Sequence, residues 1–113
     1  MDTTKPASHA LKEQPKNGLY VRGVVISNRA STFRRKDGTG MGVKVSHEIA
    51  LQPGVAIWEK YYDPRTDKDV EFDGVNVTKF PKLEEFQPIT LRAERFKIFD
   101  NKFIISSAAE LKS

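Results

Sequence analysis

The residues best suited to chemistry in this sequence are cations beside an aromatic ring, concentrated at one place in the chain. The three consecutive cations Arg34, Arg35 and Lys36 follow Phe33, and two glycine-containing turns come directly after them. A single strand of nucleic acid offers phosphates to such cations and flat bases to such a ring. The same cations would also serve merely to solvate the end of a hairpin. This segment by itself leaves both interpretations open.

A second aromatic and basic cluster consists of Trp58, Lys60 and Tyr62, which alternate along one strand-like run and therefore share a face. If Ile57 and Tyr61, on the other face, fill the core, Trp58 points outward and its ring can stack on a base. Stacking of this kind contributes about 1–3 kcal/mol per base. In the opposite register, Trp58 would instead be a core residue.

The residues predicted to bind nucleic acid combine aromatic rings for stacking with cations for phosphate contact. The rings are Trp58, Tyr62, Phe33 and Tyr20, and the cations are Arg22, Arg34, Arg35, Lys36, Lys44 and Lys60. Three further candidate phosphate contacts are Arg92, Arg95 and Lys97. For any single cation, a solvated surface position explains its presence equally well.

Catalytic and metal-binding patterns are weak. The sequence has no cysteine and only two histidines, His9 near the N-terminus and His47 within an apolar strand-like run, which argues against a zinc site. The alternating acidic residues from Asp67 to Asp73 do not form a calcium loop, because Phe72 stands where that loop needs glycine. Neither a nucleophile elbow nor a phosphate-binding loop leading into a helix is present. We therefore expect no enzyme activity, no metal and no cofactor.

Runs of alternating apolar and polar residues predict five strands to carry these side chains. The runs cover residues 19–31, 41–51, 55–62, 88–99 and 102–109. The first two would form a long hairpin that ends at the basic tip. Gly23 predicts a β-bulge that moves the inward face of the first strand to Val24 and Ile26.

Residues 63–87 interrupt the strand pattern. The segment 70–77 predicts a small hairpin on an Asp-Gly turn. Residues 80–86 predict one or two helical turns, because Pro81 suits the first helical position and Phe80, Leu83 and Phe86 would share a side. Five strands with a short helical insert between the third and fourth are the parts of an all-β, partly open Greek-key barrel.

Length predicts one domain, and the mild net positive charge matters less than where the basic residues are placed. The chain has 113 residues and a formal net charge of +4. Residues 1–17 are polar and predict a flexible arm, so the folded domain is expected over residues 18–113. No apolar run approaches the ~20 residues that span a bilayer. We expect no membrane association and a cytoplasmic protein, or one of the host cytoplasm if a phage encodes it.

The order of these parts resembles the OB fold (oligonucleotide/oligosaccharide-binding). More narrowly, it resembles single-stranded DNA-binding proteins such as bacterial SSB, primosomal replication protein N and phage helix-destabilising proteins. The segments that carry the likeness are Tyr20–Val25, Phe33–Gly40, Ile57–Tyr61, Pro88–Ala93 and Ile104–Ala108. The likeness is architectural, and it spans about residues 18–111.

The resemblance implies sequence-tolerant binding of single-stranded DNA in replication, recombination or repair. Exposed strand edges of such barrels commonly pair, which predicts a homodimer, and replication proteins are further candidate partners. Two alternatives stay open at this point. One is a protein-interaction adaptor of a replication complex, and the other is an RNA-binding OB barrel, since stacking and phosphate contacts serve RNA equally.

Overall fold

The computed structural model describes residues 17–111, which form seven β-strands and no helix. The strands are β1 (Leu19–Arg34), β2 (Met41–Ala50), β3 (Val55–Tyr62), β4 (Glu71–Phe72), β5 (Val77–Lys79), β6 (Pro88–Phe99) and β7 (Lys102–Leu111). The all-β prediction and the five predicted strands are therefore confirmed. The small hairpin predicted on the Asp-Gly turn is present as β4 and β5. The predicted N-terminal arm lies outside the described residues, apart from Asn17.

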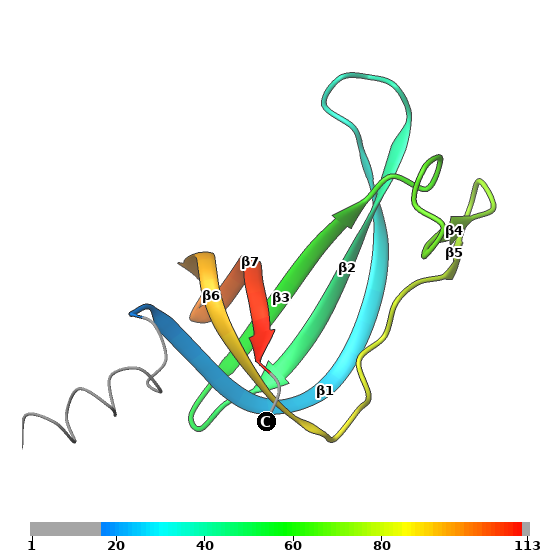
Figure 1. The fold of residues 1–113 in the computed structure, drawn as a ribbon. Helices are drawn as coiled ribbons and strands as arrows, with labels where there is room; N and C mark the ends of the chain where they lie inside the picture. The colour runs from blue at the N-terminus through cyan, green and yellow to red at the C-terminus, as the bar shows by residue number, and fades with distance from the viewer. Residues whose placement is uncertain (1–16, 112–113) are drawn as a thin grey trace, which may run out of the picture.

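Five strands close into a ring in the order β1-β2-β3-β7-β6, with β6 beside β1 again (Figure 1). All neighbours in the ring are antiparallel except β3 and β7, which run parallel. The long strand β1 belongs to both sides of the ring. Residues 19–24 of β1 pair with β6, and residues 24–34 pair with β2. The far half of the β1–β2 hairpin extends beyond the ring as an arm (Figure 1), and β3 follows β2 along it as far as the pairing of Tyr62 with Val43.

The bend in β1 is located at Ile26, so the bulge predicted at Gly23 is misplaced. The pairing register between β1 and β2 shifts between Val25 and Ser27. Val25 remains buried, whereas Val24 and Ile26, the predicted inward residues, are exposed. Gly23 has a different purpose, because a Cβ at this position would collide with the carbonyl oxygen of Ala50. The glycine thus permits a close approach of β1 to β2 rather than an extra residue.

The predicted helical turns at residues 80–86 do not form, because this segment bonds to the bulge of β1 instead. The Phe86 N–H donates to the Val25 carbonyl at 2.7 Å, and the Val25 N–H donates to the Gln87 carbonyl at 3.0 Å. The Asn28 side chain completes the attachment by bonding both the N–H and the carbonyl of Leu83, each at 2.9 Å. These long-range bonds satisfy backbone groups that a helix would have satisfied internally.

Two apolar clusters fill the interior. The larger one lies inside the ring and includes Val21, Ile49, Trp58, Leu91 and Ile105. The smaller one lies under the β1–β2 arm, where Val43 and Val45 pack against Val70 and other residues of the insert between β3 and β6. The insert therefore covers the inner face of the arm and leaves its outer face uncovered. Within the described residues, no helix is long and apolar enough to cross a membrane.

Candidate functional site

The prediction that Trp58 faces outward is wrong. Trp58 is only 6% exposed and belongs to the main core cluster. Its strand pairs with β2 so that Trp58 is opposite His47, and residues opposite each other across a sheet point to the same face. Because His47 lies on the buried face of β2, Trp58 must lie there too. This burial removes the physical basis for stacking Trp58 on a base.

Lys60 and Tyr62 follow Trp58 to the inner face of β3. The Lys60 ammonium lies over the Trp58 ring, 3.9 Å from its centroid, and burial lowers the pKa of Lys60 below its usual value. Tyr62 packs against the small cluster under the arm. The alternation predicted for β3 is correct, but its two faces were assigned the wrong way round. A lysine is expected on the outer face of a strand, so Lys60 suggested that its face points outward. In the structure the Lys60 stem and ammonium pack against the Trp58 ring at the rim of the core.

The reversed face brings Tyr61 to the surface. Tyr61 is 56% exposed and makes an edge contact with Phe33, with ring centroids 5.5 Å apart. The Phe33 ring lies directly over Gly42, where a Cβ would collide with it. The outer face of the hairpin arm therefore presents two aromatic rings here, and the missing side chain of Gly42 leaves room for the Phe33 ring. Phe33 was predicted to contact bases, whereas Tyr61 was expected in the core.

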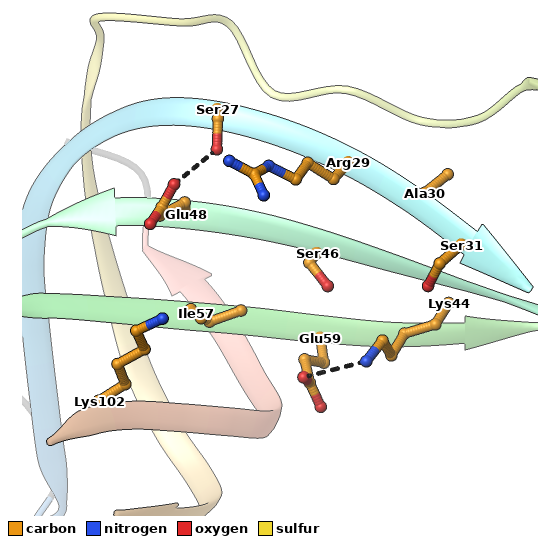
Figure 2. A pocket seen from close by; sticks show the side chains of 10 residues that line it. All are labelled: Ser27, Arg29, Ala30, Ser31, Lys44, Ser46, Glu48, Ile57, Glu59 and Lys102. Carbon is orange, nitrogen blue, oxygen red and sulfur yellow. Dashed lines mark hydrogen bonds and ion pairs between the residues drawn. The ribbon is translucent and has the colours of Figure 1, made fainter. Parts of the chain in front are cut away.

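Beside these rings, the outer faces of β1, β2 and β3 form a polar hollow with a volume of ≈ 320 Å³ (Figure 2). Three cations line it, Arg29 from β1, Lys44 from β2 and Lys102 from β7. Figure 2 shows them entering from three sides, with the Ser46 hydroxyl between them. Cations and hydroxyl groups together are the donors that a phosphate group requires.

Two carboxylates share this hollow with the cations. Glu48 accepts a hydrogen bond from the Ser27 hydroxyl at 2.9 Å, and Glu59 lies 3.7 Å from the Lys44 ammonium (Figure 2). Glu59 also accepts a hydrogen bond from the Tyr61 hydroxyl at 3.1 Å. Burial, helped by the Glu59 carboxylate next to it, raises the pKa of Tyr61. Tyr61 therefore stays a neutral ring at physiological pH.

A second hollow continues from the first on the other side of Glu59. It lies between Tyr61 on β3 and three consecutive residues of β6, Arg95, Phe96 and Lys97. The Phe96 ring stacks on Phe103 with centroids 4.8 Å apart and is still 48% exposed. The two hollows adjoin at Glu59; cations line both of them, and the Tyr61 and Phe96 rings line the second. We call the lining of both hollows, together with Phe33, the groove.

The basic tip of the β1–β2 hairpin is only partly available. Arg35 forms an ion pair with Asp63 at 3.2 Å, and Arg65 donates to the Thr39 carbonyl at 2.9 Å. Hydrogen bonds from Arg65 hold the pKa of Asp63 down to about 2, so this carboxylate remains charged. The tip is thereby tied to the loop after β3. Arg34 and Lys36, on either side of Arg35, are exposed.

The remaining predicted residues fall into two places. Lys44 lies in the groove, as just described. Tyr20 and Arg22 lie on the opposite side of the ring, where β1 pairs with β6. They line a separate hollow near the turn between β2 and β3. The bulge at Ile26 causes this separation, because the half of β1 before it pairs with β6 and the half after it pairs with β2, on different sides of the ring.

His47 is buried beneath the groove without taking part in it. One ring nitrogen, Nδ1, lies 2.7 Å from Asn28 Oδ1, and the other, Nε2, has no hydrogen-bond partner among residues 17–111. Because Asn28 Oδ1 also accepts the Leu83 N–H, it acts as the acceptor and Nδ1 carries the proton. Burial, helped by the nearby Lys60 charge, lowers the pKa of His47 to about 4. His47 is therefore a neutral structural residue that joins β1 and β2, as its apolar setting predicted.

The groove residues missed by the assignment of binding residues are Tyr61, Phe96, Arg29 and Lys102. Arg95 and Lys97 had been candidate phosphate contacts on charge alone. Tyr61 could have been predicted only if the outward face of β3 had been assigned correctly. Phe96 could have been predicted only from the fact that β6 and β7 continue past the ring. Among residues 17–111, no group of three or more His, Cys, Asp or Glu side chains is arranged to hold a metal ion.

Comparison of the chain with protein-family models, curated proteins and solved structures finds no match.

Proposed function

We propose that this protein binds single-stranded DNA with little sequence preference, along the groove on the outer face of β1, β2 and β3. The observation that carries the proposal is the exposed Tyr61 ring in the second hollow, which it lines together with Phe96, Arg95 and Lys97, next to the cation-lined first hollow. A single strand carries both phosphates and flat bases, and the groove offers cations for the first and exposed aromatic rings for the second. Duplex DNA hides its base faces and would leave Tyr61 and Phe96 without stacking partners.

We infer further that the ring is an OB fold. The strand order β1-β2-β3-β7-β6 and the parallel contact between the third and the last long strand support this inference. OB folds bind single strands on the face of their second and third strands, between two hairpin loops. The groove lies on that face, between the β1–β2 arm and the β6–β7 hairpin. Because the fold also serves RNA and protein ligands, the groove residues rather than the fold carry the functional argument.

In this proposal, the cations hold the backbone and the rings hold the bases. Arg29, Lys44 and Lys102 would contact phosphates in the first hollow, and Arg95 and Lys97 in the second. Tyr61 and Phe96 would each stack on a base. Lys44 must leave Glu59 to bind a phosphate; the contact between them is long, at 3.7 Å, and a phosphate would replace one anionic partner of the Lys44 ammonium by another.

The test is a fluorescence anisotropy titration of a labelled mixed-sequence DNA strand at several salt concentrations. We expect binding that weakens with salt, with a log–log slope of about −0.7 for each phosphate contacted. The same sequence as a duplex should bind more weakly, because its bases are not available for stacking. An RNA strand of the same sequence distinguishes the RNA-binding alternative. Equal affinity for duplex and single strand, or no binding at low salt, would refute the proposal.

A second candidate function is a protein-interaction adaptor, and one observation favours it. The end of the β6–β7 hairpin exposes two large apolar residues, Ile98 at 75% and Phe99 at 66%. Residues 94–99 of β6 pair only with β7 among the described strands, so their outer edge is available to another strand. A second copy of this chain, forming the predicted homodimer, or a replication protein would bind there. Sedimentation of the wild type and of Ile98→Asp tests the homodimer, which predicts a dimer that the substitution dissociates.

A further inference from the structure

Glu59 occupies the centre of the groove, where a bare phosphate-binding surface would not be expected to carry a negative charge. The Glu59 side chain is 16% exposed. Among the described residues, Glu59 alone lines both hollows. A carboxylate in this position repels the phosphates of a single strand. The Tyr61 hydroxyl and the Lys44 ammonium hold this carboxylate, and of the phosphates, sugars and bases of a DNA strand only the bases carry N–H donors that could bond to it.

The hydrogen bonding of Glu59 leaves room for such a contact. Oε1 accepts the Tyr61 hydroxyl, and Oε2 faces the Lys44 ammonium. Two carboxylate oxygens together offer about four acceptor positions, so acceptor capacity remains. The Tyr61 hydroxyl bond also fixes the carboxylate at the end of the exposed ring. A base stacked on that ring would direct its hydrogen-bonding edge toward Glu59.

The four bases differ in what they offer a carboxylate. Guanine has two adjacent donors, N1–H and the N2 amino group, which match the two oxygens of one carboxylate. Cytosine and adenine each offer one amino group, as in the known pairing of Glu or Asp with the cytosine N4 amino group. Thymine has a single N3–H between two carbonyl oxygens, and both oxygens would face the carboxylate unfavourably.

We propose that Glu59 reads the base stacked on Tyr61 and gives the groove a preference for guanine over thymine. The proposal rests on the proposed function and adds a compositional preference to otherwise sequence-tolerant binding. The preference belongs to one position of the strand, because only one carboxylate is shared by the two hollows. The other positions contribute through stacking and phosphate contacts, which every base supplies.

The experiment compares oligo-dT with strands of the same length that carry isolated guanines or isolated inosines at the same positions. Inosine retains N1–H and lacks the N2 amino group. We expect the guanine strand to bind about 5- to 10-fold more tightly than oligo-dT, near the lower end of the range for a two-bond base contact. The inosine strand should lie between the two. These wild-type ratios require no variant and therefore do not depend on a substitution that folds.

Glu59→Gln then assigns the preference to this side chain. Glutamine keeps the shape but has one carbonyl oxygen and one amino group, which can donate to thymine. We expect tighter binding of oligo-dT, because a repulsive charge is removed, and a guanine-to-thymine ratio close to one. Glu94→Gln is the matched control, since Glu94 is exposed, pairs with Arg92 at 3.5 Å and does not line either hollow. It should leave the ratio unchanged.

The possible failures are distinguishable. If oligo-dT and the guanine strand bind the wild type equally, single-strand binding stands and base reading by Glu59 is refuted. If Glu59→Gln tightens both strands by the same factor and preserves the ratio, Glu59 acts only as a charge and the proposal is also refuted. If no strand binds the wild type at low salt, the proposed function itself fails and the base preference fails with it.

Discussion

Replacing Tyr61 by alanine should weaken single-strand binding while leaving the fold nearly intact. Tyr61 is 56% exposed, and its described contacts are the edge of Phe33 and the hydrogen bond to Glu59. Loss of the aromatic pair costs about 0.5–1.5 kcal/mol of stability. Loss of one base–aromatic stack costs about 1–3 kcal/mol of binding. Since 1.4 kcal/mol is a factor of ten, we expect Kd to rise about 5- to 150-fold.

A set of variants separates this effect from general damage. Tyr61→Phe keeps the ring and should retain most of the affinity. Phe86→Ala removes a ring that is 71% exposed but lies outside the groove, so it should leave Kd unchanged. Trp58→Ala should instead cost about 3–5 kcal/mol of unfolding free energy, because it empties part of the core.

The assays are DNA anisotropy for Kd and urea unfolding for stability, each performed on every variant. The expected pattern is a binding defect for Tyr61→Ala and a stability defect for Trp58→Ala. The reasoning is refuted if Tyr61→Ala binds within twofold of the wild type at matched salt. It is also refuted if Phe86→Ala weakens binding as much as Tyr61→Ala, since the loss would then have no connection with the groove.

Three further predictions concern charge, pH and packing. Lys102→Gln should weaken binding and reduce the steepness of the log–log salt dependence by about 0.7, whereas Lys79→Gln, outside the groove, should not; equal slopes would exclude Lys102 from phosphate contact. The pKa of His47 lies near 4 in the folded protein and near 6.5 when unfolded, so the unfolded state binds more protons between these values and stability falls as pH drops from 6.5 to 4. Urea unfolding should show this loss of unfolding free energy, up to about 1.4 kcal/mol per pH unit. The His47→Gln variant should lose less unfolding free energy between about pH 6.5 and pH 4. If wild type and variant lose the same amount, the lowered pKa of His47 is contradicted. Gly23→Ala should lower the unfolding free energy by about 1–3 kcal/mol in urea, because its Cβ meets the Ala50 carbonyl; an unchanged midpoint would contradict the close approach.

Local errors in the sequence interpretation arose where long-range contacts competed with local preferences. Residues 80–86 have a proline and an apolar spacing suited to helical turns. The β1 bulge nevertheless offers backbone partners at Val25, and Asn28 offers its side chain to Leu83. Neither partner is close in sequence, so no local pattern reports them. Gly23 shows the same limit, because a glycine in a strand fits a bulge and a close approach equally well.

The sequence by itself determined the five long strands, most of their ends to within one or two residues, and the inward face of β2. Alternation of side chains along a strand is a local property, and in β2 only one face is apolar enough to be buried. On β3 both faces carry apolar and polar side chains, so alternation separated Trp58 from Tyr61 without indicating which one is inside.

Only the tertiary structure decided that question. The pairing of Trp58 with His47 across two strands places Trp58 in the core and Tyr61 at the surface. The groove was equally beyond the sequence, because it joins β1, β2 and β3 to the β6–β7 hairpin through the ring closure. Lys44 and Lys102 lie far apart in the chain and meet because β3 pairs with β2 on one edge and with β7 on the other.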